Sequence, residues 1–338
     1  ADVRRLGSMK GSAGLAESFT FKKKKQKMIK FELKNQAYMI GETELTTEML
    51  LQYPHEIEGD NGEILLPYKV GDKVITPSGR TSNVTDVFPH PQKDIYRFTF
   101  DDGRTVDAGL EHLWRVWGRF EGGNWMYKVV DTEHIIKMLS QPSKKKSTYI
   151  DLLDNIGDVK DKDLPIDPYC LGALLGDGGF SSGNVYIHCG DSEVLDILES
   201  RIKCGPRLQR PGCEMINIST KAENYSFFIE SGLKGCLSGD KFIPEEYLNG
   251  SRDQKLELIR GLFDTDGYVS EKGFVEFYTK SEKMAKQVQE IIWSLGGFCK
   301  IKIKIPTIKG KIYSPCHRMQ IRMKDPSVLF NLKRKKDR

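Results

Sequence analysis

Two stretches of the chain share one pattern of apolar and polar positions, a run rich in apolar and small residues that ends in Asp-Gly. The first run extends from Leu171 to Gly178 and the second from Ile259 to Gly267. Side chains four residues apart lie on one face of a helix, so each run predicts a helix whose small residues allow close packing of a second helix. These small residues are Gly172 and Gly176 in the first run and Gly261 and Thr265 in the second.

Each predicted helix ends at an aspartate, Asp177 in the first run and Asp266 in the second. The glycine that follows predicts a left-handed cap at the helix end. If the helices touch, the two carboxylates lie side by side at helix C-termini, where the helix dipole is negative. A divalent cation is the obvious source of compensating charge. The alternative for either run alone is an ordinary buried helix that ends in an Asp-Gly turn.

The two runs belong to a duplicated unit. Asp177 and Asp266 lie 89 residues apart (266 − 177), and the segments that follow, 185–198 and 275–288, both read as a strand, a turn and an amphipathic helix. The sequence therefore predicts an α+β protein in which a helix-strand-strand-helix unit occurs twice, with a carboxylate at the same point of each copy.

These residues resemble the LAGLIDADG homing endonucleases over roughly 165–330. The resemblance implies a pseudo-two-fold αββαββα fold in which the two motif helices form the interface between the halves. It also implies that Asp177 and Asp266, with Gly176 and Thr265, hold two or three Mg²⁺ ions over the scissile phosphates. The implied protein is a monomer that cleaves double-stranded DNA at a long asymmetric target site.

Hydrolysis of a phosphodiester also needs positive charge near the attacking water and the leaving alkoxide. The segment Gly239 to Pro244 resembles the family's lysine followed by Ile-Pro, which implies a catalytic role for Lys241; the alternative is a surface lysine before a Pro-capped helix. Lys280, at a predicted strand-to-helix corner, is the candidate in the second copy. Asp264 has no acidic counterpart in the first copy, so we expect a cap or an outer group there rather than a metal ligand.

For DNA recognition, the resemblance implies a curved sheet in each copy whose concave face fills the major groove. Strand alternation predicts lysines on one face and isoleucines on the other between Lys300 and Lys304. Arg and Gln can read base edges, and Lys can hold phosphates; a plain edge-strand charge display is the alternative. The candidates are Lys300, Lys302, Lys304, Lys309, Lys311, Arg318, Gln320 and Arg322 in the second copy, and Arg207, Gln209 and Arg210 in the first.

Residues 61–130 show short strands with turns, which predicts a small all-β module. The module resembles the Hint (intein) fold, in which a histidine at the position of His112 activates a splice junction; a structural histidine beside Trp114 is the alternative. Gly109 stands where that family has a threonine, no cysteine precedes Cys170, and the first position is Ala1. The chain ends in Lys-Lys-Asp-Arg rather than His-Asn. We therefore expect no splicing by this chain alone, and splicing only with a C-terminal intein fragment.

The predicted organisation has four parts. Residues 1–60 form a basic arm of unclear fold, 61–130 the incomplete Hint-like module, 131–164 a linker and 165–338 the endonuclease, with its copies at about 165–240 and 241–330. The lysine runs at 22–25, 144–146 and 333–336 are typical of solvated surface, but beside a phosphate-cleaving motif they also indicate a polyanion footprint.

Cysteine usage and hydropathy narrow the remaining choices. The seven cysteines include no Cys-x-x-Cys pair, which argues against a zinc site and favours reduced thiols. No apolar run is long enough to span a bilayer, so we expect a cytoplasmic or nucleoid-associated protein without a membrane partner. The leading hypothesis is a site-specific homing endonuclease of intein origin. The alternatives are a splicing segment that needs a C-terminal Hint part, and a cleavage-dead, maturase-like nucleic-acid binder.

Overall fold

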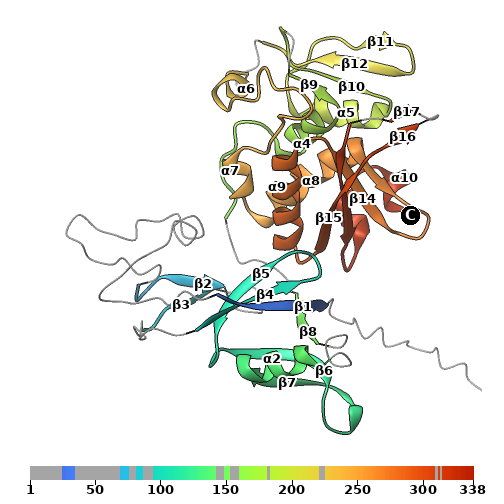
Figure 1. Cartoon of the computed structure of the whole chain (residues 1–338). Coiled ribbons are helices and arrows are strands. Elements are labelled where there is room, and N and C mark those ends of the chain that lie inside the picture. Colours follow the sequence, from blue (N-terminus) through green and yellow to red (C-terminus); the bar gives the residue numbers. More distant parts are fainter. Residues whose placement is uncertain are drawn as a thin grey trace, which may run out of the picture.

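The structure is a computed structural model that describes residues 25–34, 69–75, 81–86, 94–141, 148–152, 160–180, 183–220, 225–308, 311–312 and 314–338. Its helices and strands gather in two lobes (Figure 1), of which the first ends near residue 152 and the second begins near residue 160. None of the helices within the described ranges is long and apolar enough to cross a bilayer. All seven cysteines are free thiols.

The first lobe is an antiparallel sheet of six strands in the order β5-β4-β1-β8-β6-β7. A short pair, β2 (Lys73–Ile75) and β3 (Thr81–Asn83), lies apart from it, and the 3-10 turn η1 (Glu121–Gly123) joins β6 to β7. The six strands are β1 (Lys25–Lys34), β4 (Ile95–Phe100), β5 (Thr105–Gly109), β6 (Leu113–Arg119), β7 (Trp125–Asp131) and β8 (Tyr149–Asp151).

Helix α2 (Thr132–Ser140) covers one face of this sheet and forms its core. It begins where the Asp131 side chain accepts a hydrogen bond from His134 N at 2.8 Å, the usual N-cap contact. Its buried Ile135 packs among Phe98 of β4 and Trp114 of β6. Helix α2 lies just outside 61–130, the range for which the strand pattern predicted an all-β module. Both α2 and β8 lie in the predicted linker, and β1 lies in the predicted arm, so the sheet draws on segments on both sides of 61–130.

The second lobe repeats one order of elements twice. The first copy contains α4 (Pro168–Asp177), β9 (Gly178–Gly179), β10 (Tyr186–Cys189), α5 (Ser192–Arg201), β11 (Leu208–Arg210), β12 (Cys213–Asn217) and α6 (Phe227–Glu230). The second contains α8 (Arg252–Asp266), β13 (Gly267–Val269), β14 (Val275–Thr279), α9 (Glu282–Ser294), β15 (Phe298–Lys304), β18 (Cys316–Arg322), the 3-10 turn η2 (Pro326–Leu329) and α10 (Lys333–Lys336). The short α7 (Glu245–Leu248) joins the copies, and β16 (Thr307–Ile308) and β17 (Lys311–Ile312) form a hairpin before β18.

Both copies have the same sheet topology. The strand orders are β9-β10-β12-β11 and β13-β14-β18-β15, so in each copy the first, second, fourth and third strands are neighbours. All these pairs are antiparallel. The helix-strand-strand-helix unit inferred from the two runs thus occurs twice, within the αββαββα order that the resemblance implied.

Helices α4 and α8 pack against each other with almost no side chain between them. A Cβ atom on Gly172 would lie 2.0 Å from Leu258 O, and one on Gly261 would lie 2.0 Å from Tyr169 O. Both separations are far inside van der Waals contact, so only glycine fits at these two crossings. The close approach predicted from the small residues therefore brings the two helix ends together.

The glycines after the aspartates differ from expectation. Gly178 has φ −79° and Gly267 has φ −82°, both extended rather than left-handed. Each is instead required for space, because a Cβ on Gly178 would lie 2.2 Å from Leu174 O, and one on Gly267 would lie 2.6 Å from Phe263 O. The chain thus leaves each helix directly into a strand, β9 or β13.

The two lobes touch through the β4–β5 turn and α9. Gln289 of α9 donates a hydrogen bond from Nε2 to Asp102 O at 3.3 Å. The Arg104 guanidinium lies over the ring of Trp293, with its carbon 4.9 Å from the ring centroid.

Candidate active site

The aspartates Asp177 and Asp266 are the last residues of α4 and α8. An ideal Cβ on Gly176 would lie only 3.6 Å from Asp266 Oδ2, so the second carboxylate lies against the last turn of the first helix. Burial raises the pKa of Asp177. Desolvation at the crowded helix end and the charge of Asp177 raise the pKa of Asp266 to about 6, although Asp266 keeps an exposed surface. The two acids form one coupled pair of negative charges.

Lys241 closes the end of the first motif helix. It is 6% exposed, and its Nζ donates hydrogen bonds to Leu175 O at 2.9 Å, Gly176 O at 2.9 Å and Gly178 O at 2.8 Å. These carbonyls include ones that a helix C-terminus leaves without partners. Burial lowers the pKa of the Lys241 ammonium, and the charges of Asp266 and Asp177 oppose this effect. Lys241 thus lies at the end of α4, and its catalytic role stays a prediction.

Lys335 holds the matching position in the second copy. Its Nζ donates to Phe263 O at 2.8 Å, Asp264 O at 2.7 Å and Gly267 O at 2.8 Å, and the residue is 6% exposed. Sequence reasoning missed this lysine because it lies within a basic run that was interpreted as surface charge. Its separation from Asp266 was the available signal, since it nearly equals that of Lys241 from Asp177 (335 − 266 against 241 − 177).

The predicted second lysine, Lys280, is placed differently. It is exposed in the turn between β14 and α9, while the next residue, Ser281, caps α9 by accepting a hydrogen bond from Met284 N at 3.0 Å. We therefore assign the buried basic position at the end of α8 to Lys335 and not to Lys280.

Gly176 and Thr265 face each other across the helix contact. An ideal Cβ on Gly176 would lie 2.0 Å from Thr265 Oγ1. The threonine hydroxyl donates back into its own helix, to Leu262 O at 2.9 Å and Gly261 O at 3.1 Å. Its side chain is therefore committed to the helix. Gly176 O already accepts a hydrogen bond from Lys241 Nζ, so the backbone carbonyl of Thr265 is better placed to ligate a cation than that of Gly176, contrary to the pairing that the resemblance implied.

The donor set fits a hard divalent cation. The described residues contain no group of three or more His, Cys, Asp or Glu side chains with metal-ligand geometry, so a transition-metal cage is not built from them. Two carboxylates with backbone carbonyls nearby offer only oxygen, which Mg²⁺ prefers together with water and phosphate. Burial raises the pKa of both acids, and the charge of Asp177 adds to this effect at Asp266, so a bound cation would favour their ionised forms.

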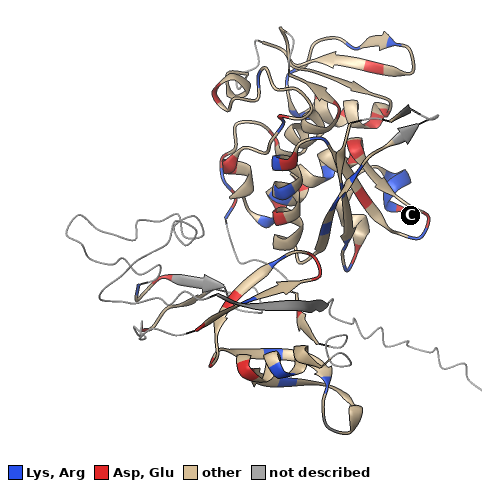
Figure 2. Cartoon of the chain, in the orientation of Figure 1, with Lys and Arg blue, Asp and Glu red and all other residues tan. Residues whose placement is uncertain are grey.

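One face of the second copy's sheet carries most of the predicted DNA contacts. Lys300 lies opposite Gln320 and Lys302 opposite Arg318, and Figure 2 shows the basic colour along β15. The other face is apolar, since Met319 and Ile321 of β18 are buried. Arg322 continues the polar row at the end of β18 and is exposed.

This face is more than a row of unpaired basic side chains. The Arg318 guanidinium is paired with Glu276, whose carboxylate also accepts the Tyr278 hydroxyl at 2.6 Å. Ile303 was expected on the inner face but is 73% exposed, because β15 extends there beyond the core. Lys304 lies with its Nζ 4.9 Å from the centroid of the Tyr278 ring. Lys309 lies outside the described residues, as does the side chain of Lys311.

The first copy separates its three predicted DNA contacts. In the register of β11 and β12, Gln209 pairs with Glu214 and Arg210 with Cys213, so Gln209 and Arg210 lie on opposite faces. The Arg207 guanidinium bonds Glu214 and the α5 acids Asp196 and Glu199. Because α5 covers the inner face, Arg207 is held on the helix side of the sheet. Only Arg210 keeps the outward position.

His112, the predicted splicing residue, precedes β6 in the first lobe. It is exposed, and its ring meets the Trp114 ring edge to face with centroids 5.0 Å apart. The Trp114 indole donates to Thr132 Oγ1 at 2.8 Å, and this hydroxyl donates to His112 O at 3.3 Å. The surroundings of His112 therefore fix a strand end, in keeping with the structural alternative.

Comparisons with known proteins find a family match within the second lobe. Residues 253–327 match the family described as LAGLIDADG-like domain, and this segment contains most of α8 and the sheet of the second copy. This segment is therefore similar to a LAGLIDADG-like domain. It is also 26% identical over 285 residues to a replicative DNA helicase DnaB of Mycobacterium intracellulare, an alignment that covers 79% of this chain and 45% of the relative. The chain thus spans less than half of the length of that relative.

Among solved structures, one match is from a study of mesophilic variants of the homing endonuclease I-DmoI. It has a TM-score of 0.33 and 15% identity, and covers 48% of this chain and 87% of the other. That likeness is too weak to establish the fold, which rests on the element order and sheet topology described above.

Proposed function

We propose that this protein is a site-specific, metal-dependent endonuclease that hydrolyses one phosphodiester bond in each strand of a double-stranded DNA target. The observation that carries the proposal is the paired arrangement at the helix ends. Asp177 and Asp266 end two touching helices, and each helix end holds a buried lysine, Lys241 or Lys335. A nucleic-acid binder without cleavage activity has no need of two carboxylates held in this unfavourable proximity.

Each residue has a distinct part in the proposed reaction. Asp177 and Asp266, with the carbonyl of Thr265, would hold the cation. When bound, Mg²⁺ supplies Lewis-acid stabilisation of the phosphoryl oxygens and of the leaving alkoxide. The charges of Lys241 and Lys335 oppose the rise in the pKa of Asp266 and so favour its ionised form, which binding of a cation requires. Their ammonium groups also add positive charge beside the scissile phosphates.

DNA binding is assigned to the outer face of the two sheets. On the second sheet, Lys300, Lys302 and Lys304 hold phosphates, while Gln320 and Arg322 reach base edges in the major groove. On the first sheet, Arg210 has the corresponding place. Phosphate contacts dominate affinity and base contacts dominate sequence choice, so the target is expected to be long and asymmetric because the two sheets carry different side chains.

We also propose that the chain derives from an intein. Two observations support it: the antiparallel first lobe with its Hint-like sequence, and the match to a replicative helicase, which is the kind of result expected for an element inserted within a helicase chain. The alternative function is that of a splicing segment that acts with a C-terminal Hint part. His112 is the residue that would serve it.

Incubation with DNA tests the function directly. The substrate is double-stranded DNA that carries an uninterrupted mycobacterial replicative-helicase gene, beside a randomised library of the same length. With Mg²⁺ we expect a double-strand break at one position, and with EDTA binding without a break. Binding without any break in either substrate with Mg²⁺ or Mn²⁺ would support the maturase-like alternative instead.

A further inference from the structure

Asp264 is a buried carboxylate that the proposed reaction does not use. It lies in the last turn of α8, two residues before Asp266, and has no exposed surface. The equivalent position of the first copy is Leu175. Apolar packing therefore suffices at this point of a motif helix, and the carboxylate in the second copy requires another reason.

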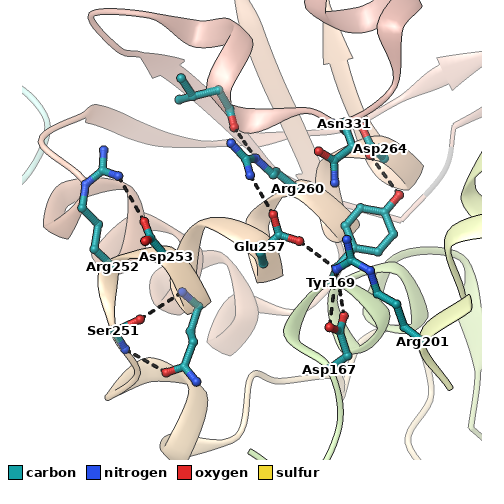
Figure 3. A network of polar contacts seen from close by, with 12 residues as sticks. Asp167, Tyr169, Arg201, Ser251, Arg252, Asp253, Glu257, Arg260, Asp264 and Asn331 are labelled. Carbon is teal, nitrogen blue, oxygen red and sulfur yellow. Dashed lines mark hydrogen bonds and ion pairs between the residues drawn. The ribbon is translucent and has the colours of Figure 1, made fainter. Parts of the chain in front are cut away.

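The partners of Asp264 supply that reason. Its Oδ1 accepts hydrogen bonds from Asn331 N at 3.0 Å and Leu332 N at 3.1 Å, and its Oδ2 accepts one from the Tyr169 hydroxyl at 3.0 Å. Figure 3 shows the carboxylate between Tyr169 and Asn331. Two of the three donors are consecutive backbone N–H groups of the segment that leads into α10. Hydrogen bonds to a buried charge are among the strongest in proteins.

That segment, the lysine arm (331–336), delivers Lys335 to the site. Leu332 is the N-cap residue of α10, so Asp264 holds the point at which the short helix begins. Three residues later, Lys335 turns back to donate to the carbonyl of Asp264 itself. Asp264 is thus bonded to both ends of the loop that sets the position of the Lys335 ammonium group.

A second polar contact of the lysine arm, made by Arg334, is weaker. Arg334 pairs with Asp191 of the first copy at 3.0 Å from Nε to Oδ1, but the Arg334 side chain is 55% exposed. Exposed ion pairs contribute little and are screened by salt. In the first copy Lys241 needs no such carboxylate, since Ser281 Oγ donates to Lys241 O at 2.6 Å.

We propose that Asp264 is a positioning residue that fixes the lysine arm and thereby sets Lys335 at the end of α8. Asp264 does not touch DNA or the cation in this role. The inference rests on the proposed function only for its consequence in catalysis. It makes the two half-sites unequal, because Lys335 depends on this carboxylate and Lys241 does not.

Acylation of lysines in the full-length, metal-free protein tests the position of Lys335 without any DNA. In the native protein Lys335 and Lys241 should react slowly with an acetylating reagent, since both ammonium groups are buried and bonded. In Asp264→Leu, which copies Leu175 of the first copy, Lys335 should be labelled about tenfold faster or more because the arm opens locally, while Lys241 should keep its native rate. Tyr169→Phe is the matched control. It removes the Tyr169 hydroxyl that donates to the Asp264 carboxylate but leaves the two backbone N–H donors of the lysine arm in place, so Lys335 should stay protected.

Asp264→Asn keeps the volume and one acceptor oxygen, and should give a smaller increase at Lys335 alone. Native labelling rates at Lys335 in both Asp264 variants would overturn the proposal. Equal increases at Lys335 and Lys241 in Asp264→Asn would also overturn it, because they would indicate a general loss of packing.

Cleavage adds the functional arm of the experiment. On a supercoiled target plasmid, Asp264→Leu should accumulate nicked circles, because one half-site loses its lysine. If the native protein cuts no DNA but the labelling pattern appears, the proposed function fails and the positioning role stands. If the native protein cuts and Asp264→Leu shows both native labelling of Lys335 and native cleavage of both strands, the positioning role fails alone.

Discussion

Lys241 and Lys335 occupy equivalent places, each donating three hydrogen bonds from Nζ to carbonyls at the end of its own copy's motif helix. The two residues come from segments with no sequence similarity, since Lys241 precedes Phe-Ile-Pro and Lys335 lies in Lys-Arg-Lys-Lys. The ammonium groups of Lys241 and Lys335 therefore follow the pseudo-two-fold symmetry of the site, although the segments that carry them do not resemble each other.

Replacement of Lys335 by Met should slow cleavage of one DNA strand by about a hundredfold, as expected for loss of a charge that stabilises the transition state. Lys280→Met is the matched control, since Lys280 is exposed and close in sequence to the same copy's sheet. It should cleave normally. Strand-specific rates on end-labelled DNA measure both. A slow Lys280→Met with a normal Lys335→Met would restore the sequence-based assignment.

Gly261→Ala tests the link between helix contact and catalysis. The added Cβ would lie 2.0 Å from Tyr169 O, so α4 and α8 must separate. Overpacking typically costs about 1–3 kcal/mol, whereas a shift of a reacting group by about 1 Å can cost on the order of a hundredfold in rate. Cleavage should therefore fall much further than thermal stability or DNA affinity.

The control for this change is Gly183→Ala, because nothing lies within 4 Å of its added Cβ. It should leave the melting temperature, DNA affinity and cleavage rate as they are. If Gly261→Ala has a lower melting temperature than the native protein but its folded fraction cleaves at the native rate, the helix contact serves only to stabilise the core.

The raised pKa of Asp266, about 6, gives a pH dependence with a definite sign. A carboxyl whose folded pKa exceeds its unfolded value contributes stability that is present at low pH and is lost as the pH rises through about 6. In the metal-free protein, Asp266→Asn should therefore raise the melting temperature above that of the native protein at pH 7 to 8. The difference should shrink below pH 5, where Asp266 is protonated.

Thermal melts of both proteins with EDTA, between pH 4.5 and 8, measure this difference. Addition of Mg²⁺ should reverse the order at pH 7.5, because only the native protein keeps both carboxylates for the cation. A native protein that is more stable than Asp266→Asn at pH 8 without metal would contradict the electrostatic description of the pair.

The sheet register separates two basic residues that the sequence had grouped together. Lys302→Ala should weaken binding to all DNA sequences about equally and reduce the slope of log K against log salt by about 1, as loss of a single phosphate contact does. Arg207→Ala should leave DNA binding unchanged, because Arg207 bonds acids on the helix side of its sheet. Salt titrations of both variants are the measurement, and a larger salt effect for Arg207→Ala would oppose the register.

The sequence predicted the parts of the site that depend on local pattern. The spacing of Gly172, Gly176 and Gly261 identified the helix contact, and the repeat of Asp-Gly identified the pair of acids. Lys241 was found because the segment Gly239 to Pro244 resembles the family's lysine followed by Ile-Pro. These features can be recognised in the sequence because each depends on residues that are close together along the chain.

What the sequence did not predict depends on contacts between distant segments. Lys335 lies in a basic run and donates hydrogen bonds to carbonyls at the end of α8. Nothing in the sequence of such a run distinguishes a buried lysine from an exposed one. The lysines around β1 (Lys25–Lys34) similarly obscured a strand in the middle of the first sheet, whose partners β4 and β8 lie far along the chain. The opposite placement of Gln209 and Arg210 required the register of β11, which the pattern alone does not fix.

In the proposed reaction, Asp177 and Asp266 together support hydrolysis of DNA with a divalent cation. The most direct test of this claim is cleavage of a target plasmid by Asp177→Asn, Asp266→Asn and the double variant, with DNA affinity measured in parallel. Each loses a metal ligand worth several kcal/mol of transition-state stabilisation, so none should make a double-strand break, while affinity should stay near native because phosphate contacts dominate it. A double variant that linearises the plasmid at the native rate would contradict the account.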